Sequence, residues 1–276
     1  MKRRDFLVTG TAGLATLTTA TTVLGQQRAP GLLNRRANRS AQQEFIEVRK
    51  YTVKDADKLA QLVVLLDKAL VPALNRQGLK PVGVFTPFPQ DEKQKKFDRN
   101  VFVVAPHKTT ESFVSVNAKL LADSVYRKDA APIFETTSKD PVYTDCETYL
   151  LQGFPTMPGV EVPSLGPDRV FQLRLYRSFN IERNEAKIHM FDKGGELPLF
   201  REVGLNPIFF GNILAGTRMP AFLYMIGCPS LENHGETWQT FVKHPKWLAI
   251  KDLPEYKDTA TEIDAIILKP SPGSQI

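Results

Sequence analysis

Two stretches of the chain repeat the same alternation of apolar and polar positions. Residues 45–51 read Phe-Ile-Glu-Val-Arg-Lys-Tyr, and residues 170–176 read Val-Phe-Gln-Leu-Arg-Leu-Tyr. Alternation with a period of two is typical of a β-strand. A second shared pattern, Gly-Leu-x-Pro, follows each stretch at nearly the same distance, at residues 78–81 and 204–207. The sequence therefore indicates an internal duplication.

The first copy reads as strand, helix, strand, strand, helix, strand. Leucine and valine recur at helical spacing through residues 55–77, where Pro72 should kink or end the regular helix and Gly78 should stop it. Thr110 can cap the second helix. The expected strands are 45–51, 80–85, 101–105 and 145–151. This order is that of a ferredoxin-like unit.

The second copy repeats this order. Its strands are expected at 170–176, 206–210, 221–226 and 262–268. One helix should span residues 182–203, with an interruption near Gly194-Gly195 and Pro198, and Ser230 can cap another. After Pro245 the chain is expected to be irregular up to the last strand.

These elements predict the architecture. A ferredoxin-like sheet carries both helices on one face and leaves its other face bare, and two such sheets can bury their bare faces against each other. We therefore predict an α+β protein of two tandem ferredoxin-like repeats packed as an α+β barrel. The expected segments are a leader (1–25), a disordered basic spacer (26–43), the first repeat (44–151), a Pro- and Gly-rich linker (152–168) and the second repeat (169–276).

The positive charge of the chain is confined to its first 43 residues. The formal net charge is +6, of which residues 1–25 contribute +2 and residues 26–43 contribute +4. Residues 44–276 are therefore neutral overall, which removes the main argument for nucleic-acid binding.

The chain begins like an export signal. The pair Arg3-Arg4 precedes Phe6-Leu7, and no charged residue occurs from there to Gln27. This pattern resembles a twin-arginine signal, which addresses folded proteins for export, and Val23-Leu24-Gly25 suits cleavage. We expect a periplasmic or secreted protein without stable membrane insertion after cleavage. An uncleaved membrane anchor is the alternative, although the repeated threonines weigh against it.

Three segments of the second repeat resemble the NIPSNAP family. They are Gly194–Arg201, Gly204–Gly211 and Trp238–Trp247, and the first repeat is similar more loosely at residues 48–51 and 78–83. The resemblance implies the dimeric α+β barrel fold and is compatible with a homo-oligomer, but it implies no set of catalytic residues. The first repeat has Ser112-Phe113 where we align Thr237-Trp238 of the second, which argues against two equivalent sites.

The first strand of each copy has one face rich in polar side chains. These are Glu47, Arg49 and Tyr51 in the first copy and Gln172, Arg174 and Tyr176 in the second. The helices should cover the opposite, apolar face, so we expect the polar face to point into the space between the sheets. There a cavity for a small anionic or polar ligand could be lined by Arg49, Arg174, Glu47, Tyr51 and Tyr176.

The alternative is that these charges only stabilise the barrel. A buried arginine needs a partner, and Arg49 can pair with Glu47 two residues away. Arg174 has the neutral Gln172 in that position. Its partner would be a distant acid, such as Glu47 across the interface, or an anionic ligand.

No metal or cofactor is expected from the remaining polar residues. The histidines, His107, His189, His234 and His244, lack the spacing of a helical metal site, and there is no Gly-rich phosphate loop between a strand and a helix. A haem held by His189 or His234 is an alternative that relatives of this fold suggest. Cys146 and Cys228 are expected to be buried single thiols, although an exported protein could pair them.

Two functions from different classes fit this sequence. The first is an exported module that binds a small ligand or another molecule. The second is a small-substrate enzyme, of the monooxygenase or isomerase kind, that uses the cavity between the sheets. A filled barrel would favour the module. An enclosed polar cavity with a convergent pair, such as Arg174 and a nearby His or Tyr, would favour the enzyme.

Overall fold

The computed structural model describes residues 42–88 and 99–276. The expected leader and all but the last two residues of the expected spacer lie outside these residues. Within the described ranges, no helix is both long and apolar enough to cross a bilayer.

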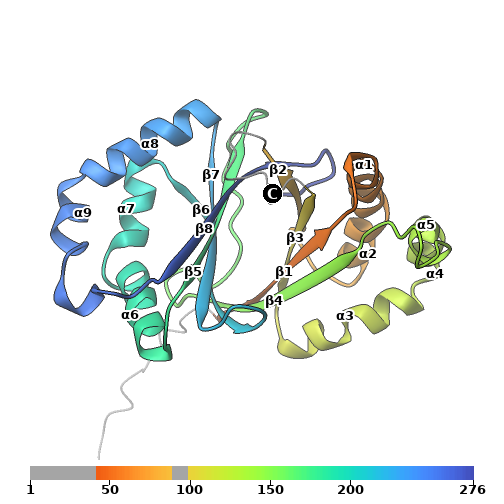
Figure 1. The fold of residues 1–276 in the computed structure, drawn as a ribbon, viewed down its shortest axis with the longest axis horizontal. Coiled ribbons are helices and arrows are strands. Elements are labelled where there is room, and N and C mark those ends of the chain that lie inside the picture. The colour runs from red at the N-terminus through yellow and green to blue at the C-terminus, as the bar shows by residue number, and fades with distance from the viewer. Residues whose placement is uncertain (1–41, 89–98) are drawn as a thin grey trace, which may run out of the picture. The chain divides into compact units, whose positions relative to one another are not determined.

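Eight antiparallel strands of the described residues close into a barrel in the order β1-β3-β2-β8-β5-β7-β6-β4 (Figure 1). The strands are β1 (Phe45–Thr52), β2 (Gly83–Pro87), β3 (Asn100–His107), β4 (Asp145–Gly153), β5 (Val170–Arg177), β6 (Asn206–Ala215), β7 (Ala221–Cys228) and β8 (Glu262–Pro270). Each half of the chain contributes four consecutive barrel strands, β4-β1-β3-β2 and β8-β5-β7-β6. The predicted fold, two tandem ferredoxin-like repeats packed as an α+β barrel, is therefore confirmed.

The two halves join edge to edge at two places. β2 pairs with β8, from Phe85↔Pro270 to Pro87↔Leu268. β4 pairs with β6, and a register shift interrupts that pairing between Leu150 and Leu151. The last residues of the chain extend the first junction, because the backbone N–H of Gln275 donates to the carbonyl of Val82. Neither half therefore keeps a free sheet edge in the barrel.

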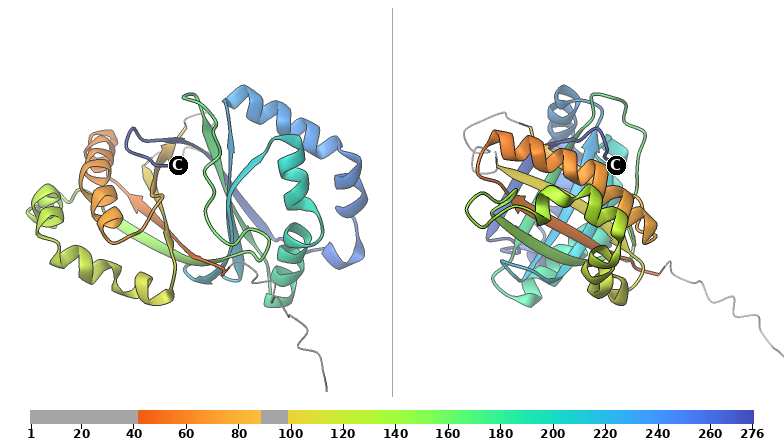
Figure 2. Two further views of the ribbon diagram at one scale, coloured as in Figure 1. Left: turned by 180° about the vertical axis from the view of Figure 1, so that it is seen from behind. Right: turned by 90° about the vertical axis from the view of Figure 1, so that its right-hand side faces the viewer.

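Helices cover the outer face of each half-sheet, as Figure 2 shows from two further directions. In the first half they are α1 (Ala56–Leu65), the π-helix η1 (Leu66–Leu70), α2 (Val71–Arg76), α3 (Thr110–Ala122), α4 (Ser124–Asp129) and α5 (Ala131–Phe134). The π-helical turn lies just before Pro72, whose ring cannot fit against a regular α-helical turn. The cap of α3 is Thr109 rather than the predicted Thr110, since the Thr109 side chain accepts from the N–H of Ser112.

The second half carries α6 (Ile181–Asp192), α7 (Glu196–Val203), α8 (Leu231–Lys243), α9 (Pro245–Ile250) and the short 3-10 turn η3 (Pro254–Tyr256). The predicted break at Gly194-Gly195 separates α6 from α7, and Gly195 has a φ of 99° that favours glycine. Ser230 caps α8 as predicted. The expectation of irregular chain after Pro245 is wrong, because this proline takes the first position of α9, where a missing N–H costs nothing.

The interior of the barrel is apolar, which corrects the predicted orientation of the first strands. The interior cluster contains Ile46 and Val48 of β1 and Phe171, Leu173 and Leu175 of β5. The polar side chains of these strands instead face outward and lie beneath the helices, with Tyr51 and Tyr176 in the helix-covered clusters. A closed barrel surrounds its interior on all sides, so the face with the most apolar side chains belongs there.

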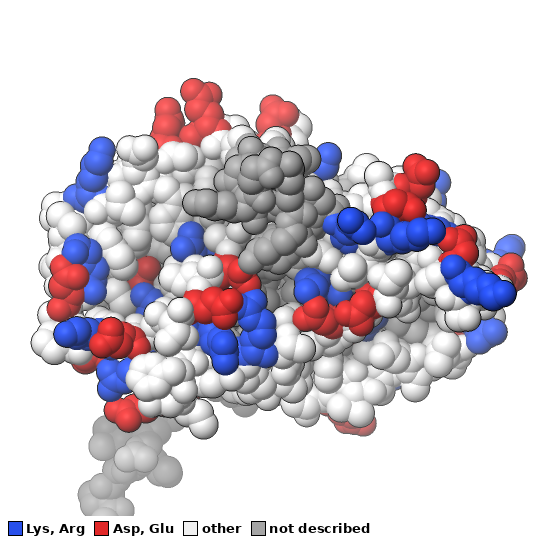
Figure 3. Space-filling view, viewed as in Figure 1, with Lys and Arg blue, Asp and Glu red and all other residues white. Residues whose placement is uncertain are grey.

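Charged side chains of both signs are intermixed on the surface. Figure 3 shows basic and acidic side chains side by side over one face of the molecule. Several form ion pairs, such as Arg201 with Glu161 and Arg76 with Asp123. This distribution agrees with the zero net formal charge of residues 44–276.

Candidate functional site

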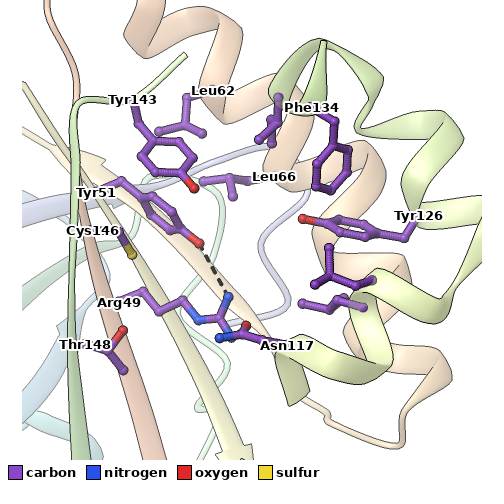
Figure 4. A pocket seen from close by; sticks show the side chains of 13 residues that line it. Arg49, Tyr51, Leu62, Leu66, Asn117, Tyr126, Phe134, Tyr143, Cys146 and Thr148 are labelled. Atoms are coloured by element: carbon purple, nitrogen blue, oxygen red, sulfur yellow. Dashed lines mark hydrogen bonds between the residues drawn. The ribbon is translucent and has the colours of Figure 1, made fainter. Parts of the chain in front are cut away.

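A pocket of about 400 Å³ lies between the first half-sheet and its helices (Figure 4). Leu62, Leu66 and Leu120 from the helices supply apolar walls. The polar side chains that line it are Arg49, Tyr51, Asn117, Tyr126, Tyr143, Cys146 and Thr148. β1 and β4 position the strand residues, because Arg49 lies opposite Thr148 and Tyr51 lies opposite Cys146 in their ladder. We call this space the first-half pocket.

Arg49 is held at the floor of this pocket by a buried acid. Its Nε donates to Glu47 Oε1 at 2.6 Å and its Nη2 donates to Glu47 Oε2 at 3.2 Å. Glu47 is 2% exposed and Arg49 is 7% exposed. Burial alone would raise the pKa of Glu47, but His107 and Arg49 outweigh it and hold that pKa below its usual value. The predicted pairing of Arg49 with Glu47 is thus present.

His107 completes this network and was not among the predicted site residues. Its side chain is fully buried, with Nε2 3.1 Å from Glu47 Oε2 and Nδ1 3.0 Å from Ser112 Oγ. The ladder pairs Glu47 with Ala105, two residues before His107 on the neighbouring strand. Alternation along that strand could have indicated that the two side chains share a face.

Among the described residues, one N–H of Arg49 has no partner and can donate to a ligand. The guanidinium has five N–H groups, and bonds to Glu47, to Asn117 Oδ1 at 3.3 Å and to Tyr51 at 3.5 Å use four of them. The hydroxyl groups of Tyr51, Tyr126 and Tyr143 point into the same space (Figure 4). Burial raises the pKa of the Tyr51 hydroxyl, so it stays protonated at neutral pH. The pocket therefore offers hydrogen-bond donors within aromatic walls.

Cys146 also faces this pocket, and its predicted burial is wrong. The residue is exposed, whereas Cys228 is buried as expected, and both thiols are free. Desolvation raises the pKa of the Cys146 thiol. It is therefore a protonated, weakly polar wall of the pocket rather than a reactive thiolate.

Arg174 occupies the equivalent position in the second half, but aromatic side chains fill the space around it. The guanidinium carbon lies 4.9 Å from the centre of the Trp238 ring and 5.4 Å from that of Tyr176. Its Nη2 donates to the Tyr176 hydroxyl at 2.9 Å. Glu47 is bound to Arg49 and His107, so it is not the partner of Arg174 across the interface that one prediction suggested.

The side chain at one equivalent helix position explains why the space beside the arginine is open in the first half and filled in the second. Asn117 and Trp238 stand the same number of residues after the caps Thr109 and Ser230. Asn117 bonds to Arg49, and the Trp238 ring covers Arg174. Trp238 therefore corresponds to Asn117 and not to Phe113, which corrects the alignment made from sequence. A small amide leaves room where an indole does not.

Two further buried charges lie near Arg174, and no sequence pattern indicated them. Lys187 is 8% exposed and Glu196 is 3% exposed, with Lys187 Nζ 3.7 Å from Glu196 Oε2. Burial raises the pKa of Glu196 to about 7. Burial also lowers the pKa of Lys187, and the charge of Arg174 lowers it further, against the opposing effect of Glu196.

The two histidines considered for haem have other contacts. His234 Nε2 accepts from the Trp238 indole N–H at 3.0 Å, and burial lowers the pKa of His234 to about 4. His189 is exposed, with Nδ1 3.0 Å from the Tyr256 hydroxyl. Within the described ranges, no group of three or more His, Cys, Asp or Glu side chains is arranged to hold a metal ion.

No protein-family model matches this sequence, and a search of curated proteins finds no match. A NIPSNAP family protein from Agrobacterium tumefaciens strain C58 is similar over part of the chain. The two are 18% identical, with a TM-score of 0.35, and the match covers 39% of this chain and 98% of that one.

Other solved structures match most of the chain. A proposed monooxygenase from Lactobacillus acidophilus NCFM has a TM-score of 0.56 at 11% identity, covering 83% of this chain and 95% of that one. An anthrone oxidase-like protein has a TM-score of 0.52 at 10% identity, covering 84% and 92%. At these identities the comparisons establish the fold, an α+β barrel of the kind seen in monooxygenase-like proteins.

Proposed function

We propose that this protein binds a small, neutral and largely aromatic molecule in the first-half pocket, with a hydrogen-bond acceptor of the ligand against Arg49. The observation that carries the proposal is the pocket itself, whose volume of about 400 Å³ is lined by aromatic and aliphatic side chains around one fixed guanidinium. Ligand pockets of proteins are commonly about 300–1,000 Å³, mostly apolar, and contain a few polar groups that orient the ligand.

The charge of the network favours a neutral ligand over an anionic one. Glu47 already neutralises Arg49, and its lowered pKa keeps it ionised at neutral pH. An anionic ligand would bring a second negative charge close to Glu47, which is itself only 2% exposed. A carbonyl or hydroxyl group can accept the remaining Arg49 N–H without that cost.

The largely filled barrel also supports a binding module over catalysis between the sheets, because the cavity beside Val48, Leu173 and Leu223 has a volume of only about 60 Å³. Phe85, Phe209 and Met225 are among the side chains that occupy the interior. An enzyme that acts on a small substrate remains a second candidate, now in the first-half pocket, because Arg49 and Tyr51 converge there and the barrel resembles that of a proposed monooxygenase. Conversion of a bound ligand under air, followed by mass spectrometry, would favour the enzyme.

Asn117→Trp should close the pocket. A tryptophan there would copy the arrangement of Trp238 over Arg174, so we expect affinity for 1-naphthamide, a neutral aromatic amide, to fall about tenfold or more. Fluorescence titration measures this affinity. Lys119→Trp is the matched control, since the exposed Lys119 lies on the other side of the same helix and should leave binding unchanged.

The same titration with 1-naphthoate tests the charge argument. This carboxylate has nearly the shape of the amide, so weaker binding of 1-naphthoate is the expected result. Equal binding of both probes by wild type and Asn117→Trp would show that they bind elsewhere. Tighter binding of the carboxylate would show that Glu47 does not set the preference.

We further propose that the protein is exported in folded form, from the twin-arginine pattern at Arg3-Arg4. Replacing both arginines by lysine should leave the precursor in the cytoplasm. Fractionation of cells followed by immunoblotting measures this distribution. Unchanged export of the double-lysine variant would show that another pathway is used.

A further inference from the structure

Two basic side chains and one buried acid lie between the second half-sheet and its helices. Arg174 and Lys187 both lie against the ring of Tyr176, at 5.4 Å and 5.5 Å from its centre. Glu196 lies 3.7 Å from Lys187 and interacts with the charges of both cations. Because Arg174 is always protonated, this cluster carries a net charge of +1 whether the shared proton resides on Lys187 or on Glu196.

The hydrogen bonds of this cluster are incomplete. Arg174 Nε and Glu196 Oε2 are buried and have no hydrogen-bond partner among the described residues. Lys187 Nζ donates to the sulfur of Met190 at 3.2 Å, which is a weak acceptor. Buried charged groups are normally paired and hydrogen-bonded, so an anion with acceptor oxygens would suit Arg174 Nε and the net positive charge of this cluster.

In the first half, the equivalent arginine has an acid beside it. Arg49 is bound to Glu47, whereas the second half has Gln172 in that strand position. Lys187 occupies the helix position that Leu62 occupies in the first half, because each follows its helix cap, Asn180 or Asp55, by the same number of residues. Compared with the first half, the second half therefore has an amide in place of the acid beside its arginine. It also has a buried lysine in place of a leucine nearby.

We propose that Lys187 is a carbamylation site, at which its buried amine reacts reversibly with carbon dioxide. The amine nitrogen adds to the carbon of CO2, one C=O π bond becomes a lone pair on oxygen, and the nitrogen loses one proton to solvent. When Lys187 starts as an ammonium, Glu196 first takes the proton that frees the amine. The products are a carbamate with charge −1 and a proton, so atoms and charge balance and no oxidant or reductant is needed.

The cluster suits this product in charge and in environment. Carbamylation with Glu196 protonated changes the net charge of the cluster from +1 to zero. The new carbamate would supply two acceptor oxygens beside the Tyr176 ring, which Arg174 also contacts, and Arg174 Nε has no hydrogen-bond partner among the described residues. Lys187 Nζ also lies 5.0 Å from the centre of the Phe191 ring and 6.0 Å from that of Trp247. These aromatic rings place apolar surface around the amine.

Isotopically labelled bicarbonate tests this proposal on the whole chain. Carbon NMR should show a saturable carbamate signal at neutral pH that disappears when CO2 is removed. Alkylation converts the carbamate to a stable ester, and peptide mass spectrometry should then place the label on Lys187. This measurement uses the wild-type protein and needs no variant. Lys187→Arg should abolish the signal, and the matched control Lys193→Arg, at an exposed lysine just after the same helix, should retain it.

The role of Arg174 gives a second measurement. Arg174→Gln should lower the occupancy at a fixed CO2 concentration about tenfold, as expected for the loss of one charge-assisted hydrogen bond. Circular dichroism confirms that each variant is folded. Absence of label on Lys187 at saturating bicarbonate, or a signal that persists in Lys187→Arg, would overturn the proposal.

Discussion

Glu47→Gln is expected to destabilise the protein by about 3–5 kcal/mol, because it leaves the buried Arg49 guanidinium without its counter-charge. The amide keeps the shape of the carboxylate, so little of this loss comes from packing. It also removes the charge that His107 contacts at 3.1 Å. Urea denaturation at neutral pH, followed by circular dichroism, measures the free energy of unfolding.

The size of this effect should depend on pH. The pKa of Glu47 is lowered in the folded protein, so its contribution is present above the usual pKa of about 4.3 and is lost as the pH falls through the lowered folded value. The difference between wild type and Glu47→Gln should therefore narrow in acid. At neutral pH and above, the titration of Glu47 should not change this difference in stability.

Two further variants show whether the pair itself is responsible. Combining Glu47→Gln with Arg49→Met removes both charges, and this double variant should be more stable than Glu47→Gln alone. Arg174→Met should cost much less than Glu47→Gln, roughly 1 kcal/mol, since no carboxylate lies within ion-pair distance of Arg174 among the described residues. Equal losses for Glu47→Gln and Arg174→Met would contradict this assignment.

The fold was predictable because its signals repeat. The alternation in residues 45–51 and 170–176 and the recurring Gly-Leu-x-Pro gave the order of elements twice, and the structure confirms that order. The orientation of these strands was not predictable from alternation alone, because both faces of each strand are covered. The interior takes Val48 and Leu173, and the helices cover Arg49 and Arg174 on the other face.

The candidate site was predictable in part. The sequence pointed to Arg49, Tyr51 and Glu47, which the structure brings together. It did not show that the open pocket belongs to the first half, because that depends on the size of the side chain at Asn117 and at Trp238. Lys187 of α6 and Glu196 of α7 meet across the break at Gly194-Gly195, and a contact across such a break leaves no periodic pattern in the sequence.

Residues 44–151 expressed alone are expected to be insoluble or dimeric, whereas residues 44–276 should unfold as one cooperative unit. The barrel interior is built from both halves, with Ile46 and Val48 packed in one cluster with Leu173 and Met225. Separation would expose this apolar face, well beyond the few hundred Å² that soluble monomers usually tolerate. It would also leave β2 and β4 without their partners β8 and β6.

The exposed edges determine which form the isolated half takes. An unpaired strand edge is a template for another chain, so β2 and β4 of one copy can pair with a second copy and rebuild a barrel. Light scattering after gel filtration measures the mass, and urea denaturation measures cooperativity. Residues 169–276, co-expressed with 44–151, should restore a soluble complex, because they supply β8, β6 and Ile276, whose side chain is buried in the shared interior. A monomer of residues 44–151 that unfolds cooperatively would contradict the shared core.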